Sequence, residues 1–208
     1  MFKTINENVS GEILEKKSKF IANVFYIETV EEAENIIKEI KKKHILARHN
    51  CYAFSVMTKD GIINRFSDDG EPSGTAGSPM LNIITSKNLT NILVVVTRYF
   101  GGILLGTGGL VRAYTGAFLE TLEQTKEIYK ELGVNSKIVV RYSDLEKLKY
   151  YLKQNNIEIE NIDYSENINV FINLTREQYK AMIDKKEDFN FLILNSEIIK
   201  EKYIIIDK

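Results

Sequence analysis

Two glycine-rich segments in the middle of the chain lie close to several arginines and could form an anion-binding surface with them. The segments are EPSGTAG at 71–77 and FGGILLGTGG at 100–109. Glycine lets another molecule approach the backbone closely, so Gly101 and Gly102 would admit a ligand. Tyr99, just before them, could stack on a nucleic-acid base, or could be a core or rim aromatic. We predict that these two segments form the functional surface.

The start of the predicted helix after the second segment is a candidate phosphate site. Gly106, Thr107, Gly108 and Gly109 leave backbone amides free at a helix N-terminus, where the helix dipole also favours an anion. Val111 takes the last position of the dinucleotide-binding glycine pattern, and nucleotide hydrolysis is not expected. The alternative is a tight turn that packs the helix against a sheet.

Four arginines flank the two segments: Arg48, Arg65, Arg98 and Arg112. Arg112 lies in the first turns of the predicted helix, where a positive charge opposes the helix dipole, so we expect a negative group near it. That group is either an acidic residue of the loop at 68–71 or an external phosphate. Arg98 ends a predicted strand and has the same two alternatives.

Acidic and hydroxyl side chains of the facing loop could bind a metal ion or transfer protons. Asp68, Asp69 and Glu71, with Ser73 and Thr75, offer the oxygen ligands that Mg²⁺ prefers. Asp-Asp-Gly and Glu-Pro are also common turn sequences. We therefore predict a supporting polar loop, and we predict no metal, no cofactor and no catalytic residue.

His44, His49 and Cys51 could form a metal site or a nucleophile–base pair. His49 and Cys51 are two apart on a predicted strand and so point to the same face. A core thiol and a polar histidine at a strand end are the favoured interpretation. A zinc site would lack ligands, and a single cysteine excludes an internal disulfide.

The bulk composition predicts a globular protein without a general affinity for nucleic acid. The chain has 208 residues, an apolar fraction of 44% and a net charge of -1. Both halves are nearly neutral, so any electrostatic attraction to a polyanion must come from a local patch. No apolar run reaches the length of a membrane span, and the N-terminus has no secretory pattern, so we expect a cytoplasmic protein.

The pattern of elements changes near residue 127 and predicts two domains, 1–127 and 128–208. The first would contain the two glycine-rich segments and a run at 91–97, NILVVVT, that is typical of a strand buried on both faces. In chain order we expect two strands within 12–27, a helix capped by Thr29, a hairpin at 50–66, a short helix at 78–85, the strand 91–97 and a helix at 108–124.

The second domain is predicted to follow the order β-α-β-β-α-β of a ferredoxin-like fold. Its expected elements are a strand at 136–142, a helix capped by Ser143 or Asp144 and ending near Gln154, a hairpin at 157–173, a helix from Thr175 to about Lys186 and a strand at 192–206. No concentrated polar or glycine pattern occurs there, so docking or support is its expected role.

The motifs DDGEPSGTAGSPML and VVVTRYFGGILLGTGGLVRAY, preceded by RHNCYAF, resemble those of the IMPACT/YigZ family, in its bacterial form with a ferredoxin-like C-terminal domain. The resemblance covers essentially the whole chain. It implies an α+β protein whose N-terminal α/β domain is like the second domain of ribosomal protein S-five. It also implies a connection with translation, because eukaryotic relatives act in translational control.

Together these observations predict a non-enzymatic protein that binds RNA or a ribosome-associated partner and regulates translation. The arginines would contact phosphate, and the glycine-rich segments would admit the ligand. The alternative is an enzyme acting on a phosphorylated or carboxylated small molecule at the Gly106–Gly109 helix start, which requires a closed pocket between the two segments. A protein-interaction module using the same groove is a third hypothesis.

Overall fold

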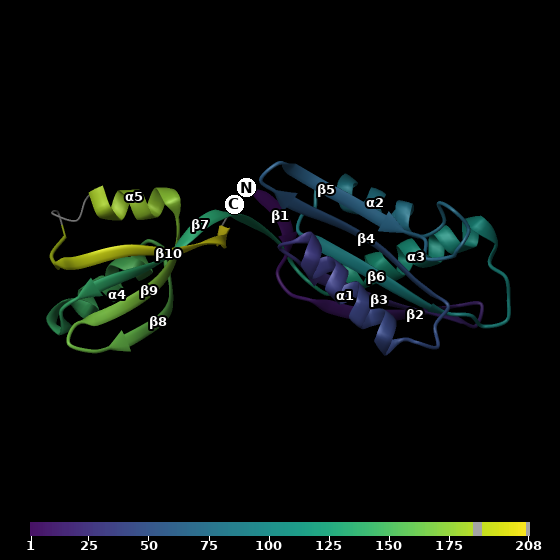
Figure 1. The fold of residues 1–208 in the computed structure, drawn as a ribbon, viewed down its shortest axis with the longest axis horizontal. Coiled ribbons are helices and arrows are strands. Elements are labelled where there is room, and N and C mark those ends of the chain that lie inside the picture. Colours follow the sequence, from purple (N-terminus) through teal and green to yellow (C-terminus); the bar gives the residue numbers. More distant parts are fainter. Residues whose placement is uncertain (185–188, 207–208) are drawn as a thin grey trace. The chain divides into compact units, whose positions relative to one another are not determined.

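The chain forms two compact units (Figure 1). A computed structural model describes residues 1–184 and 189–206. The larger unit is Phe2–Ile128, and the smaller is Tyr129–Lys208 together with Met1. Each unit combines helices with one sheet, so the protein is an α+β protein. Within the described ranges, no helix is long and apolar enough to cross a membrane.

An antiparallel five-stranded sheet forms the centre of the larger unit, with the strand order β2-β3-β6-β4-β5. Its strands are β2 (Val9–Glu15), β3 (Ser18–Tyr26), β4 (His49–Thr58), β5 (Gly61–Ser67) and β6 (Ile92–Tyr99). The predicted hairpin is confirmed, because Thr58 pairs with Gly61 and the turn consists of Lys59 and Asp60. A short strand that the sequence analysis missed, β1 (Phe2–Ile5), is not part of this sheet and pairs with β7 (Glu127–Val140).

Helices cover both faces of this sheet. The helix α1 (Val30–Lys43) packs on one face, and α2 (Gly77–Ser86) and α3 (Gly106–Leu122) pack on the other. Thr29 caps α1 as predicted, since its Oγ1 accepts a hydrogen bond of 3.1 Å from the Glu32 amide.

The central strand β6 is buried on both faces, as its apolar run predicts. Val94 and Val96 pack into the cluster beneath α2 and α3, whereas Leu93 and Val95 pack into the cluster beneath α1. Alternate residues of a strand point to opposite faces, so a continuous apolar run satisfies both clusters. The strand therefore holds its last residues, Arg98 among them, in a fixed position.

The helix after the second glycine-rich segment begins at Gly106, two residues before the predicted start at Gly108. Its N-cap residue is Leu105, and no side chain there accepts a hydrogen bond from the first turn. Glycine has a low helix propensity, so the apolar periodicity of the sequence becomes visible only beyond the glycines. The whole Gly106–Gly109 run is consequently the first turn of α3.

The smaller unit contains an antiparallel sheet in the order β10-β7-β9-β8. Its elements are β7 (Glu127–Val140), α4 (Leu145–Gln154), β8 (Glu158–Tyr164), β9 (Ile168–Thr175), α5 (Arg176–Asp184) and β10 (Ile193–Ile206). The predicted order β-α-β-β-α-β is confirmed. Thr175 caps α5 as expected, because its Oγ1 accepts from the Gln178 amide at 3.1 Å. The expected helix end at Lys186 lies outside the described residues, and β7 begins earlier than predicted.

Candidate functional site

The predicted site residues gather at one end of the sheet in the larger unit. The strands β2, β5 and β6 end there, and β3 and β4 begin there. We call this region the loop end and define it by residues 15–18, 44–49, 67–76 and 99–106. Figure 1 shows it at the right of the larger unit, together with the start of α3.

The register of three strands places the side chains of the site. Arg98 on β6 lies opposite Phe20 on β3 and opposite His49 on β4. Residues that are paired in this way point to the same face of the sheet, here the face covered by α2 and α3. The Arg98 guanidinium also lies over the rings of Phe20 and Phe100, at 5.4 and 5.5 Å from their centres.

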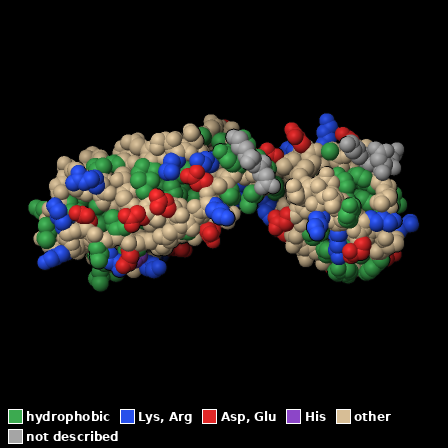
Figure 2. All heavy atoms as spheres, turned by 180° about the vertical axis from the view of Figure 1, so that it is seen from behind, with side chains coloured by type: hydrophobic (Ala, Val, Ile, Leu, Met, Phe, Trp, Pro, Cys, Tyr) green, Lys and Arg blue, Asp and Glu red, His purple; other side chains and the backbone are tan. Residues whose placement is uncertain are grey.

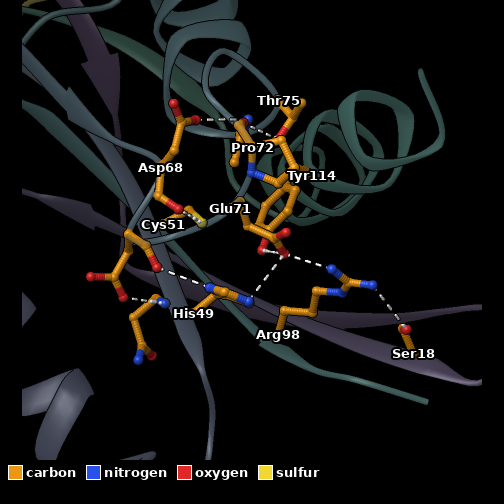
Figure 3. Close-up of polar contacts among 12 residues, drawn as sticks. Ser18, His49, Cys51, Asp68, Glu71, Pro72, Thr75, Arg98 and Tyr114 are labelled. Carbon is orange, nitrogen blue, oxygen red and sulfur yellow. Dashed lines mark hydrogen bonds and ion pairs between the residues drawn. The ribbon is translucent and has the colours of Figure 1, made fainter. Parts of the chain in front are cut away.

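Glu71 and Arg98 form a buried ion pair at the centre of the site (Figure 3). Arg98 Nη1 donates to Glu71 Oε1 at 2.7 Å, and the two side chains are only 6% and 4% exposed. The Tyr114 hydroxyl of α3 donates to the same oxygen at 2.8 Å, and burial raises the pKa of this hydroxyl far above its usual range. Arg98 also donates to Ser18 Oγ at 3.4 Å. Of the two partners considered for Arg98, an acidic residue of the loop at 68–71 and an external phosphate, the structure shows the acidic residue, which is Glu71.

Asp68 organises the first glycine-rich segment and the start of α2. Its carboxylate accepts hydrogen bonds from the amides of Gly74, Ala76 and Gly77 at 2.8, 3.0 and 2.8 Å. These groups include amides at the N-terminus of α2, which no side chain at its own N-cap position satisfies. Asp68 therefore replaces the missing helix cap, and its oxygens are occupied by the chain itself.

Asp69 connects the same loop to β4 and to α1. Its carboxylate accepts from the Asn50 amide at 2.7 Å and pairs with Lys41 at 2.6 Å. Its backbone has a φ of 42°, and Gly70 follows with 87°, which forms the predicted tight turn closed by the Glu71 amide on the Asp68 carbonyl. Each of the three acidic residues thus has an internal partner. The described residues contain no group of three or more His, Cys, Asp or Glu placed to hold a metal.

His49 and Cys51 point to the same face of β4, as predicted, and both contact the acidic loop. His49 Nδ1 lies 2.9 Å from the Asp69 carbonyl, which can only accept, so this nitrogen carries the hydrogen. His49 Nε2 lies 4.0 Å from Glu71 Oε1. The Cys51 thiol is fully buried and donates to the Asp68 carbonyl, and burial raises its pKa to about 12. A protonated thiol is a poor nucleophile, which leaves Cys51 in a structural role.

A pocket of about 380 Å³ opens between the two glycine-rich segments. Its walls are mainly apolar, and its polar groups come from Arg48, His49, Glu71, Arg98 and Thr107. The apolar lining residues are Pro72, Phe100, Leu104, Leu105 and Leu110. Its size is that of a small-molecule site.

The remaining predicted residues lie around this pocket or away from it. Arg48 and Arg112 are exposed and pair with no carboxylate of the described residues, whereas Arg65 pairs with Glu34 at 2.9 Å on the outer part of β5. The Tyr99 hydroxyl is 2.9 Å from His44 Nδ1 and is half-buried.

The sequence predicts that a ligand approaches the backbone closely at the glycines. At Gly101 it is another segment of the same chain that does so. A Cβ there would lie 2.0 Å from the backbone of Lys17, and the Gly101 amide donates to Ser18 Oγ. Gly102, Gly106 and Gly108 are exposed, and Ser73 is exposed, whereas Thr75 is buried and donates to the Pro72 carbonyl at 2.6 Å.

Several residues of the site were not among the predicted ones. Tyr114 followed the apolar periodicity of a helix, so its hydroxyl gave no separate signal, and Ser18 lies about 80 positions from its partner Arg98. Lys16 and Lys17 have φ values of 44° and 69° in the β2–β3 turn, a conformation that is unfavourable without glycine. The pair of adjacent lysines between two predicted strands was the feature of the sequence that could have pointed to this turn.

The fold and the site define a two-domain α+β protein whose larger unit carries a pocket and a group of basic loops at one sheet end. Residues 16–122 match the Impact N-terminal domain, and residues 138–185 match a domain of unknown function.

The chain is 36% identical over 199 residues to the IMPACT family member YvyE of Bacillus subtilis, covering 96% of this chain and 87% of that one. It is also 36% identical to YigZ of Escherichia coli over 176 residues, covering 84% and 86%. The crystal structure of a hypothetical protein superposes with a TM-score of 0.62 at 32% identity, covering 93% of this chain and 97% of that one. The chain belongs to the IMPACT family, with the two-domain arrangement of its bacterial YigZ and YvyE members.

Proposed function

We propose that this protein is a non-enzymatic binding protein that contacts RNA, on the ribosome or beside it, through the loop end of its larger unit. The observation that carries the proposal is a separation of charge. The three acidic residues of the loop at 67–76 are occupied internally, by backbone amides for Asp68, by Lys41 for Asp69 and by Arg98 for Glu71.

Basic residues of the loop end and of the adjoining helix ends remain available. Six of them form no ion pair with a carboxylate in the part of the chain described: Lys16, Lys17 and Arg48 of the loop end, Lys42 and Lys43 at the end of α1, and Arg112 near the start of α3. Figure 2 shows Lys and Arg side chains at the left end of the larger unit, which is this end, with apolar side chains and some Asp and Glu side chains among them. A domain that is neutral overall thus presents a local basic patch, which is what binding to phosphate requires.

The chain topology produces the patch. The helix α1 begins with Glu31 and Glu32 at the far end of the sheet and finishes with Lys41–Lys43 at the loop end. The β2–β3 turn adds two lysines in the left-handed backbone conformation, which costs about 1 kcal/mol or more per residue. A two-residue hairpin turn requires this conformation at both positions, and here both exposed side chains are cations.

Exposed apolar side chains on the same loops extend the contact surface. Ile45, Leu46 and Leu104 are 82%, 87% and 83% exposed. Apolar groups of this size on a surface are typical of an interface with another macromolecule, which suits a ribosome-associated partner. We propose that the larger unit resembles the second domain of ribosomal protein S-five, that the smaller unit is ferredoxin-like and that the domains are 1–127 and 128–208. The smaller one would provide docking or support.

Co-sedimentation with ribosomes and with ribosomal RNA across a salt series tests this proposal. We expect binding that weakens as salt rises, because each phosphate contact releases counterions. Arg48→Glu and Arg112→Glu should each weaken binding and lower the salt slope by about 1. Lys59→Glu is the matched control, because Lys59 is an exposed cation in the β4–β5 turn at the opposite end of the sheet. Binding that is absent at low salt, or equally affected by all three variants, contradicts the proposal.

The pocket favours a second function, a site for a phosphorylated or carboxylated small molecule. Gly106 and Thr107 at the start of α3 line it together with Arg48, so the free amides of the first helical turn and one free guanidinium lie at the same cavity. A thermal-shift screen with phosphorylated metabolites tests this alternative. Stabilisation that disappears in Arg48→Glu would support it, and no stabilisation by any compound would count against it.

A further inference from the structure

The hydrogen-bonding groups at the base of the pocket limit what it can bind. Glu71 Oε1 already accepts hydrogen bonds from Arg98 and Tyr114, whereas Oε2 accepts none from the described residues. The side chain of Glu71 is only 4% exposed, and Glu71 lines the pocket. Among the described residues Oε2 is not one of the fully buried atoms that lack a partner, so its remaining surface is open to a donor that a ligand brings.

His49 provides a second acceptor beside the first. Because Nδ1 donates its hydrogen to the Asp69 carbonyl, the lone pair of the neutral form of the ring is on Nε2. Nε2 is 4.0 Å from the Glu71 carboxylate, which is too far for a hydrogen bond between them. Figure 3 shows the His49 ring and the Arg98 guanidinium approaching the Glu71 carboxylate from neighbouring strands.

Two neighbouring acceptors at the base of an apolar pocket require two neighbouring donors on the ligand. The charge of Glu71 is balanced by Arg98, so a neutral ligand fits the base better than an additional cation. The ligand must also be largely apolar, since Phe100 and Leu110 form part of the walls, and a planar ring could stack on Phe100.

We propose that the pocket binds a guanine base. Among the RNA bases only guanine presents two adjacent N–H donors, at N1 and the 2-amino group, with no acceptor between them; its O6 carbonyl lies on the other side of N1. Adenine and cytosine place an acceptor next to their amino group, and uracil flanks its single N–H with two carbonyls. Thr107 and Arg48 supply donors for the guanine carbonyl and for a phosphate at the mouth.

The guanine can belong to single-stranded RNA or to a free nucleotide. Only in the first case does the inference rest on the proposed RNA-binding function. Unstacked bases that enter protein pockets are the usual route to sequence-specific RNA recognition. The basic patch of the loop end would then hold the backbone, and the pocket would read one base. A free nucleotide would use the pocket and Arg48 alone.

Calorimetric titration of the full chain with GMP, IMP, AMP and UMP tests the base. We expect GMP to bind best, IMP to bind about tenfold more weakly or worse because it lacks the 2-amino donor, and AMP and UMP to bind more weakly still. A uridine hexamer with one central guanosine, compared with the all-uridine hexamer, separates the two sources. Preference for the guanosine hexamer without GMP binding assigns the pocket to RNA, and GMP binding alone assigns it to a nucleotide.

Two variants distinguish recognition of the base from a general loss of structure. In Glu71→Gln the amide oxygen is expected to face the donors of Arg98 and Tyr114. The amide N–H₂ group then takes the position of Oε2, so that a donor replaces an acceptor. Guanine binding should be lost, and the preference should shift toward uracil, which a merely unstable variant would not show. Leu104→Asp adds a charge to the exposed wall of the pocket and should weaken GMP binding. Ile62→Asp, at an exposed apolar site in β5 away from the pocket, should not.

Equal affinity for all four nucleotides, or no binding of GMP and no preference between the hexamers, overturns the inference. Protection of the Cys51 thiol confirms that each variant is folded, because this thiol is fully buried in the native larger unit. Failure here leaves salt-dependent, base-independent RNA binding intact. Conversely, GMP binding without ribosome co-sedimentation would leave the guanine pocket and remove the RNA function.

Discussion

Replacing Arg98 by methionine removes the positive partner of Glu71 and keeps a flexible side chain of similar length between Phe20 and Phe100. The Glu71 carboxylate, with its side chain 4% exposed, would then retain only the Tyr114 hydroxyl as a donor. Removing one member of a buried ion pair typically costs about 3–5 kcal/mol. We expect Arg98→Met to lower the free energy of unfolding of the larger unit by about this amount.

The single cysteine makes the larger unit measurable by itself. Cys51 is fully buried there, and the chain contains no other cysteine. Pulsed alkylation across a urea series therefore reports unfolding of this unit alone, without interference from the smaller one. Small domains lose about 1–3 kcal/mol of stability per molar urea, so a loss of about 3–5 kcal/mol should lower the midpoint by about 1–5 M.

A double-mutant cycle separates the ion pair from the packing of the arginine. Glu71→Gln in the Arg98→Met background should restore part of the loss, since no uncompensated charge remains, and the coupling free energy should reach about 1–3 kcal/mol. Arg112→Glu serves as the control and should leave the midpoint nearly unchanged, because Arg112 is exposed and has no carboxylate partner among the described residues. Arg98→Met with an unchanged midpoint, or a cycle without coupling, would refute the reasoning.

Three further results are expected from the same site. Because burial raises the pKa of the Cys51 thiol to about 12, the native protein should resist alkylation by iodoacetamide at pH 8. The unfolded thiol ionises near its ordinary pKa of 9, so the contribution of Cys51 to the free energy of unfolding should be fully present below pH 9 and should fall as the pH rises toward 12. A urea series at each pH would measure this loss. Gly101→Ala should cost about 3 kcal/mol or more, since its Cβ would lie 2.0 Å from the backbone of Lys17, whereas Gly102→Ala should cost only about 1–2 kcal/mol for its φ of 86°; similar midpoints for the two would exclude this explanation. Asp68→Ala removes the acceptor of three backbone amides at the start of α2 and should cost about 2 kcal/mol, with faster amide hydrogen exchange in the first turn of that helix; unchanged exchange there would exclude a capping role.

The sequence by itself determined most of the elements and the burial of the central strand, but not the short strand β1 or the early starts of β7 and α3. The run at 91–97 predicts a strand buried on both faces, and β6 is such a strand, because alternate apolar residues satisfy clusters on the two sides of the sheet. Thr29 and Thr175 mark helix starts correctly, since capping depends on side chains within one turn. The concentration of glycine also pointed to the region where the loops of the larger unit meet.

Only the tertiary structure decided which of the charged residues are free. Asp68, Asp69 and Glu71 are equally plausible partners of Arg98 in the sequence, but strand register and the tight turn bring Glu71 to it, across 27 positions. The other two carboxylates are directed to backbone amides and to Lys41. Ion pairs between distant segments depend on strand register and loop conformation, which local periodicity does not encode. For the same physical reason, the pocket and its two free acceptors exist only in the folded chain.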